Sequence, residues 1–193
     1  MNTLFPLEPA FPQGFAYLPD FIDNKQEEDL LHAISKEELH QLQFRGYEAK
    51  RKVASFGYDW SFEKRTLSKG RDIPGAFRLL VEKVAAHLSI SERSIAELLI
   101  TEYPAGSMIN WHRDAPPFDI IAGVSLCSDC VFRLRPCCDG RQKKSSVVSF
   151  PVQRRSLYII RGSARKEWEH SIAPAKQVRY SITLRTLKSH QII

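Results

Sequence analysis

The sequence predicts an α+β domain in which two helices precede a double-sheet β-sandwich of jelly-roll type. Two helical patterns lie before residue 90, and from Leu98 onward the chain changes to short β-rich runs separated by turn residues. With 193 residues, 43% of them hydrophobic, the chain is long enough for one buried core and short for two. We therefore expect one domain, 1–193, with the helices covering one outer face of the sandwich.

The N-terminal half predicts an arm and two helices. Four prolines within the first twenty residues favour an extended arm over a helix. Asp23 or Asn24 can cap a helix that runs to about Lys36. A second helix follows Pro74, because its apolar residues recur with the 3.6-residue period: Phe77, Leu80, Val81, Val84, Ala85 and Leu88.

The C-terminal half predicts up to eight strands, with boundaries uncertain by about two to four residues. They are Leu98–Tyr103, Met108–His112, Ile120–Leu126, Val131–Arg135, Val147–Pro151, Ser156–Ile160, Trp168–Ile172 and Arg179–Leu187. We assign residues 96–193 to the sandwich core, and residues 1–95 to an extension with helices and a substrate lid.

Charge and cysteine usage limit the partners and the compartment. The 28 Lys and Arg against 22 Asp and Glu leave a net charge of +6, a modest bias toward anionic partners such as nucleic acid. No apolar run reaches the roughly 18 residues of a membrane span, and we see no export signal. The four cysteines lie close together at Cys127, Cys130, Cys137 and Cys138, which favours a reducing compartment. We therefore expect a monomeric cytoplasmic protein, nuclear in a eukaryote, without membrane association.

A His-x-Asp pair and a distant histidine suggest a metal site. His112 and Asp114 are two residues apart at the end of a predicted strand, so their side chains project to one face. Alone, the pair is better explained as a surface histidine beside a turn-capping aspartate. His170, in another β-rich segment, could lie opposite them in a sandwich. Two imidazoles and one carboxylate form the facial triad of non-heme iron(II) oxygenases.

The last strand carries two arginines on one polar face. In RYSITLR, Tyr180, Ile182 and Leu184 point to one side, and the other side holds Arg179, Ser181, Thr183 and Arg185. The Cα atoms of the two arginines are roughly 20 Å apart, so both cannot grip one small dicarboxylate in the same way. One could bind a distal carboxylate while the other lies nearer the metal or its carboxylate ligand. The alternative is a solvated strand face.

Together these motifs resemble the AlkB family of iron(II)- and 2-oxoglutarate-dependent dioxygenases. The family patterns N-x-Y-x-x-G, HxD, a distal His and R-x-N-x-T-x-R match TEYPAG, HRD, WEHS and RYSITLR between Thr101 and Leu187. The resemblance implies a double-stranded β-helix core with Fe(II), 2-oxoglutarate and O2 as cofactor and cosubstrates. It maps the iron ligands to His112, Asp114 and His170, and the 2-oxoglutarate site to Thr101, Tyr103, Arg179, Ser181 and Arg185.

Thr101 and Ser181 stand where the family pattern has asparagine. Their hydroxyls offer fewer hydrogen-bonding groups than an amide, so contacts to 2-oxoglutarate would be weaker or water-mediated. After HRD the chain continues Ala115-Pro116-Pro117, without the acidic residue by which some family members contact the flipped base. The sequence therefore indicates the iron chemistry more firmly than it indicates the substrate.

The resemblance implies oxidative removal of N-alkyl groups from bases of the 1-methyladenine and 3-methylcytosine type in DNA or RNA, as in DNA repair. The base must be single-stranded or flipped out to reach a buried iron. Alternating aromatic residues after a basic run resemble a nucleotide-recognition lid. In this lid we expect substrate contacts from Arg51, Phe56, Tyr58 and Trp60. The alternative is that the aromatic residues pack in the core. Two other functions remain open. One is an iron/2-oxoglutarate hydroxylase or demethylase of protein, tRNA or a small molecule, and the other is a nucleic-acid-binding module without chemistry.

Overall fold

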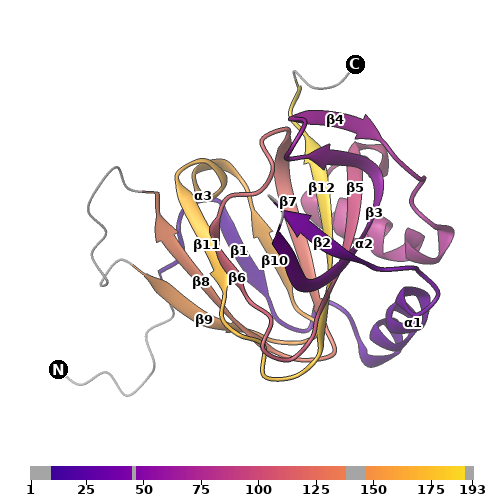
Figure 1. Cartoon of the computed structure of the whole chain (residues 1–193), viewed down its shortest axis with the longest axis horizontal. Coiled ribbons are helices and arrows are strands. Elements are labelled where there is room, and N and C mark those ends of the chain that lie inside the picture. Colours follow the sequence, from indigo (N-terminus) through magenta and orange to yellow (C-terminus); the bar gives the residue numbers. More distant parts are fainter. Residues whose placement is uncertain (1–9, 45–46, 138–146, 190–193) are drawn as a thin grey trace.

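In the computed structural model, two β-sheets face each other and two helices cover the outer side of the larger sheet (Figure 1). The structure describes residues 10–44, 47–137 and 147–189. The helical elements are α1 (Asn24–Ile34), η1 (Gly75–Phe77), α2 (Arg78–Leu88), η2 (Glu92–Ser94) and α3 (Gly162–Lys166). The strands are β1 (Phe15–Leu18), β2 (His40–Phe44), β3 (Tyr47–Ser61), β4 (Thr66–Lys69), β5 (Ile95–Tyr103), β6 (Ile109–His112), β7 (Phe118–Leu126), β8 (Cys130–Pro136), β9 (Val148–Val152), β10 (Leu157–Ile160), β11 (Trp168–Ile172) and β12 (Arg179–Leu187).

The two sheets have the alternating strand order of a jelly roll. The larger sheet runs β1-β10-β7-β12-β5-β3-β2, with β4 attached to β3, and the smaller sheet runs β6-β11-β8-β9. All of these neighbours pair antiparallel. From β5 to β12 the chain crosses between the two sheets at every step except the β8–β9 hairpin, and in the smaller sheet β6 and β11 lie side by side.

Two hydrophobic layers hold the fold together. In the outer layer, apolar residues of α1 and α2 pack on the outward face of the larger sheet, where β12 contributes Ile182 and Leu184. The inner layer lies between the sheets and is rich in aromatic rings, including Phe132, Phe150 and Tyr158. On β12 the residues between these apolar positions face the inner layer, so the predicted alternation of polar and apolar side chains is confirmed.

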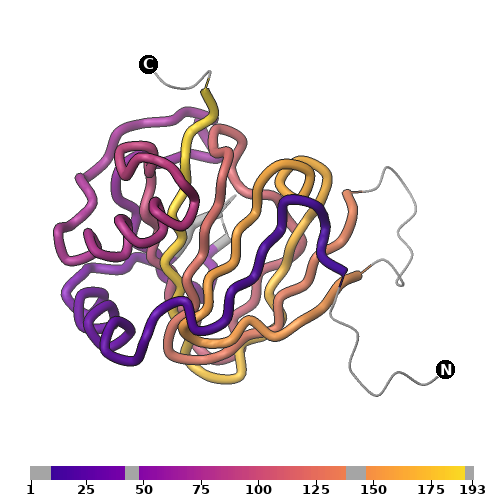
Figure 2. The backbone as a smooth tube through the Cα atoms, turned by 180° about the vertical axis from the view of Figure 1, so that it is seen from behind, coloured from indigo at the N-terminus to yellow at the C-terminus, as the bar shows by residue number. Residues whose placement is uncertain are grey.

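All eight predicted strands are present, as β5 to β12, and both predicted helices are found. Asp23 caps α1 by accepting a hydrogen bond from the Gln26 amide at 2.7 Å. The predicted N-terminal arm includes β1, which pairs with β10, as the indigo and orange segments of Figure 2 show. Residues 1–9 of that arm lie outside the described residues.

Strands β2, β3 and β4, which we call the lid strands after the substrate lid expected from the sequence, extend the larger sheet beyond the jelly-roll core. Strand β3 pairs with β5 as far as Gly57 and from Tyr58 onward pairs with β4 instead. Gly57 has a φ of 84°, and a Cβ there would lie 2.2 Å from the Ala96 carbonyl oxygen. Only glycine fits this bend without strain, so the alternation of side chains does not continue across it.

Within the described segments, no helix has both the length and the apolar character needed to cross a membrane.

Candidate metal and cosubstrate site

Arg179 is the most unusual buried residue of the interior. Its side chain is 0% exposed, and its Nε donates to Ser125 Oγ at 3.0 Å. Neither terminal nitrogen has a hydrogen-bond acceptor among the described residues. A buried guanidinium without an acceptor is costly, and a small carboxylate between the sheets would satisfy it through a bidentate pair.

The other expected 2-oxoglutarate residues line the same interior face as Arg179. Tyr103 is its cross-strand partner on β5, and the ring centroid of Tyr103 lies 4.8 Å from the guanidinium carbon. Thr101 and Ser181 form the next inward-facing pair of the two strands, and both are buried. The structure thus brings four of the five expected residues into two adjacent rows.

The three expected iron ligands lie together at the edge of the smaller sheet. His112 on β6 and His170 on β11 are cross-strand partners, with ring centroids 4.3 Å apart. Asp114 follows β6, and its Oδ2 lies 3.5 Å from His170 Nε2. His112 Nδ1 is 2.8 Å from the Asn110 carbonyl oxygen. Among the described residues, no three His, Cys, Asp or Glu side chains are already arranged to hold a metal ion. His112, Asp114 and His170 are therefore close together but do not yet point at one common position.

The protonation states at this edge suit a cation. Burial, together with the neighbouring His112, lowers the pKa of His170 to about 3, so its imidazole is neutral. Burial acts to raise the pKa of Asp114, but Arg185 and the two histidines hold that pKa well below its usual range. A neutral imidazole and an ionised carboxylate are the forms in which these groups bind metals. Phe132 stacks on His170 with ring centroids 5.4 Å apart, which limits how the imidazole can turn.

Arg185, the fifth expected 2-oxoglutarate residue, is already paired. Its Nη2 donates to Asp114 Oδ1 at 2.7 Å and its Nη1 donates to Glu97 Oε2 at 2.7 Å. It lies next to the carboxylate of an expected iron ligand, as anticipated for one of the two arginines. Both of its terminal nitrogens already have carboxylate partners, whereas those of Arg179 have no acceptor among the described residues.

Two buried charged residues near the site, Glu97 and Arg165, were not anticipated from the sequence. Glu97 is 2% exposed on the inward face of β5, and Arg165 on α3 is 8% exposed. Arg165 Nη2 lies 3.1, 2.8 and 3.2 Å from the carbonyl oxygens of Asp114, Ala115 and Phe118, so it fixes the loop that carries Asp114. Glu97 could have been found, because it shares the alternation of Thr101 and Tyr103. Arg165 has no comparable signal.

The expected substrate residues of the lid fall into different environments. Phe56 is 2% exposed and packs against Phe77 with centroids 6.4 Å apart, so it is a core residue, and contact with substrate does not fit its position. Tyr58 and Trp60 are half-buried, beyond the bend at Gly57. Arg51 is half-buried, and its Nε has no hydrogen-bond acceptor among the described residues.

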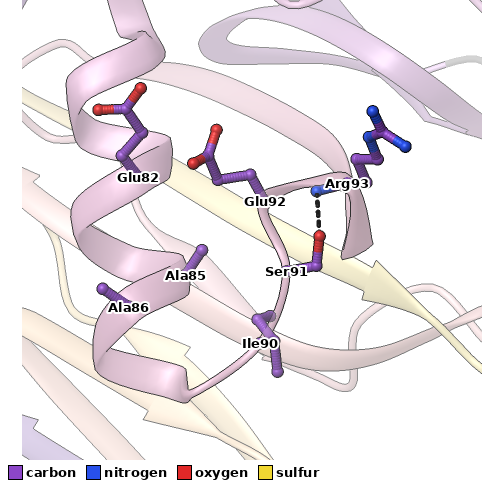
Figure 3. A pocket seen from close by; sticks show the side chains of 7 residues that line it. All are labelled: Glu82, Ala85, Ala86, Ile90, Ser91, Glu92 and Arg93. Carbon is purple, nitrogen blue, oxygen red and sulfur yellow. Dashed lines mark hydrogen bonds between the residues drawn. The ribbon is translucent and has the colours of Figure 1, made fainter.

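A hollow of about 380 Å³ lies between α2 and η2, on the helix side of the larger sheet. Glu82 of α2 and Glu92 of η2 line it, together with Arg93 (Figure 3). The sheet separates this hollow from the interior that holds Arg179 and the histidines. Its position and its two carboxylates argue against a role in binding an anionic substrate.

The sequence comparisons connect this geometry to known proteins. The model of the 2OG-Fe(II) oxygenase superfamily matches residues 14–185. The chain is 28% identical over 174 residues to the Mus musculus tRNA (carboxymethyluridine(34)-5-O)-methyltransferase ALKBH8, covering 86% of this chain and 25% of that protein. It is 32% identical over 120 residues to the Bos taurus RNA demethylase ALKBH5, covering 56% of this chain and 29% of that protein. The chain thus spans only about a quarter of the length of these two relatives.

Solved structures share the fold at low sequence identity. OsALKBH1 superposes with a TM-score of 0.67 at 14% identity, covering 94% of this chain and 100% of that chain. A Pseudomonas putida prolyl-4-hydroxylase superposes with a TM-score of 0.64, also at 14% identity, covering 91% of this chain and 93% of that chain. These matches confirm the predicted jelly roll. From the family match and the sequence relatives, it follows that the chain belongs to the 2OG-Fe(II) oxygenase superfamily, as an AlkB-type member.

Proposed function

We propose that this oxygenase removes N-alkyl groups from nucleobases in RNA or DNA, with His112, Asp114 and His170 holding the iron and Arg179 holding 2-oxoglutarate. The observation that carries the proposal is Arg179, a fully buried cation whose two terminal nitrogens meet no acceptor among the described residues. Such a group in the interior beside Tyr103 suits the distal carboxylate of a 2-oxo diacid.

The donor set fits iron(II). Two neutral imidazoles and one carboxylate are the ligands of non-heme iron oxygenases. Asp114 Oδ2 is buried without a hydrogen-bond donor among the described residues and faces His170. Because His112 lies beside His170 with Nδ1 near a backbone carbonyl, its other ring nitrogen is available to a metal. We expect a modest reorientation of His112 when the ion binds.

As a 2OG-Fe(II) oxygenase, the chain uses Fe(II), 2-oxoglutarate and O2. Bound together, these supply the oxidising power that inserts one oxygen atom into a C–H bond and the other into succinate, with loss of CO2. On an N-methyl group the product is an N-hydroxymethyl base, which releases formaldehyde and leaves N–H. The surrounding side chains orient the cosubstrate and exclude water: Arg179 fixes its distal end, and Phe132 shields the His170 edge.

The lid supports a nucleic-acid substrate. Strand β3 carries the basic run Lys50-Arg51-Lys52, followed beyond Gly57 by half-buried Trp60. Lys52 is paired with Glu102 at 3.5 Å, which leaves Arg51 as the better candidate for a phosphate contact. A base must leave its stack to reach the interior, at a cost of a few kcal/mol, which an aromatic ring can offset by stacking. The relative named an RNA demethylase agrees with this class of substrate.

The decisive experiment supplies Fe(II), ascorbate and 2-oxoglutarate with single-stranded oligonucleotides carrying 1-methyladenine or 3-methylcytosine, in RNA and DNA forms. We expect reversal of the methylated base, with succinate and formaldehyde formed in equal amounts. Asp114→Ala, which removes an iron ligand, should abolish all three signals. If the wild-type chain forms succinate without reversing any base, the substrate is not an alkylated nucleobase. If Asp114→Ala retains activity, the iron assignment is wrong.

A further inference from the structure

Glu97 places a second carboxylate next to the expected iron site. It lies on the inward face of β5 and is 2% exposed. Its Oε2 accepts a hydrogen bond from Arg185 Nη1 at 2.7 Å, and its Oε1 accepts one from Ser55 Oγ of the lid strand at 3.2 Å. Burial raises the pKa of Glu97, with Arg185 acting in the opposite direction. Burying a carboxylate costs free energy that a single ion pair seldom recovers in full, so stability alone does not explain this residue.

Arg185 joins Glu97 to Asp114. Its two terminal nitrogens are divided between two carboxylates, Nη1 toward Glu97 and Nη2 toward Asp114 Oδ1, both at 2.7 Å. The second oxygen of Asp114, Oδ2, receives no hydrogen bond from the described residues and lies 3.5 Å from His170 Nε2. The network therefore runs from the lid strand through Glu97 and Arg185 to one oxygen of Asp114.

The division of Arg185 determines which oxygen of Asp114 remains free. A guanidinium with a single carboxylate partner tends to bind it bidentately, using both nitrogens for both oxygens. Glu97 occupies one nitrogen, so Arg185 reaches Asp114 through the other nitrogen alone. Since Oδ1 is held in this way, Oδ2 is left to face the histidines. Without the Glu97 charge, the site would also carry one more positive charge, which opposes binding of a cation.

We infer that Glu97 is a positioning residue that holds Arg185 so that Asp114 presents a single free oxygen to the metal. The inference rests on the proposed function through its assignment of Asp114 as an iron ligand. Groups that orient metal ligands typically change metal affinity about 10- to 100-fold when they are removed. Loss of Glu97 should weaken metal binding by that amount, because misplacement of Arg185 and the extra positive charge act in the same direction.

Glu97→Gln tests the inference, because it removes the charge and keeps the size. The matched control is Glu27→Gln. Glu27 is also a buried glutamate, 1% exposed, and it pairs with Arg154 at 2.6 Å, but it contacts Cys127 at the opposite end of β7 from Phe118 and Asp114. Binding of Co(II) to the metal-free proteins is measured by calorimetry and by the visible ligand-field spectrum. We expect Glu97→Gln to bind Co(II) about 10-fold more weakly or worse with an altered spectrum, and Glu27→Gln to match the wild type.

The outcomes separate this inference from the proposed function. If Glu97→Gln binds Co(II) like the wild type, or if both variants weaken binding equally, Glu97 has no positioning role. Asp114→Asn in the same titration tests the iron assignment: unchanged binding would overturn the proposed function as well, whereas lost binding leaves the inference to be judged on Glu97 alone. Should Glu97→Gln not fold, Glu97→Asp keeps the charge but withdraws the carboxylate from Arg185. Weaker binding in Glu97→Asp supports the inference, and wild-type binding overturns it.

Discussion

Replacing Arg179 with methionine should separate the binding of 2-oxoglutarate from the stability of the fold. The guanidinium is 0% exposed, and its terminal nitrogens meet no acceptor among the described residues. Methionine has a similar length and no charge, so the substitution removes a buried cation at the cost of one hydrogen bond to Ser125. That bond contributes about 1 kcal/mol. Replacing even a paired buried charge with apolar residues of similar volume is often neutral or stabilising by about 1–4 kcal/mol, and an unpaired buried charge is still less favourable.

For the protein without cosubstrate, we therefore expect Arg179→Met to leave the unfolding temperature unchanged or to raise it by several degrees, at roughly 2–4 °C per kcal/mol for a chain of this size. Binding of 2-oxoglutarate should suffer strongly. Truncating one member of a buried charge pair costs about 2–5 kcal/mol, and 2 kcal/mol already corresponds to about 30-fold in Kd. A ligand at 100 times its Kd stabilises a protein by about 2.7 kcal/mol, so most of this stabilisation should be lost in the variant.

The assay is thermal unfolding with Mn(II) in place of Fe(II), over a titration of 2-oxoglutarate. Arg165→Met is the matched control, because Arg165 is buried too but donates to three backbone carbonyls. In the absence of cosubstrate, Arg165→Met should lower the unfolding temperature, because the three carbonyl oxygens lose their hydrogen-bond donor. A wild-type response of Arg179→Met to 2-oxoglutarate would show that Arg179 does not bind the cosubstrate. Destabilisation as large as that of Arg165→Met would show that the buried Arg179 charge supports the fold.

Burial and packing also determine how Cys130, Gly123 and Trp60 should respond to labelling or substitution. Burial raises the pKa of Cys130, so at a given pH less of this thiol is in the reactive thiolate form. In native protein at pH 8, iodoacetamide should therefore label the exposed Cys127 and spare Cys130. Equal labelling of the two cysteines, measured by mass spectrometry, would contradict this. Gly123→Ala would place a Cβ 2.1 Å from the buried ring of Tyr158. The free energy of unfolding, measured with denaturant, should therefore fall by about 1–3 kcal/mol, and a second substitution, Tyr158→Leu, should largely remove this penalty. If the effects of the two substitutions simply add, the clash is not the cause. Trp60→Ala should reduce affinity for single-stranded oligonucleotides several-fold in a fluorescence titration. Because Trp60 also packs against the inner hydrophobic layer, the variant should unfold at a lower temperature, and the titration is carried out well below it. Unchanged affinity would remove this residue from the substrate site.

The jelly-roll core could be predicted because its strands follow a simple local rule. On β12 the period of two alone places Ile182 and Leu184 toward the helices and Arg179 and Ser181 toward the interior. His112 and His170 could be expected to lie close together because a jelly roll pairs strands that are far apart in sequence, such as β6 and β11. In the lid the same rule fails at Gly57, whose left-handed backbone ends the alternation. The aromatic residues on its two sides therefore do not share one face, which no composition or periodicity could indicate.

The two arginines of β12 show where local patterns stop being informative. Both lie on the inward face of one strand, and nothing within RYSITLR distinguishes them. Their roles differ because of partners supplied from elsewhere. Arg185 meets the carboxylates of Glu97 and Asp114, which are 88 and 71 residues away. Arg179 meets the hydroxyl of Ser125 and the ring of Tyr103, and no carboxylate among the described residues pairs with it. A chain with leucine at position 97 would keep every residue of the family motifs. Arg185 would then be free to bind both oxygens of Asp114, so the motifs fix the identity of the ligands but not the way in which the aspartate is presented to the metal.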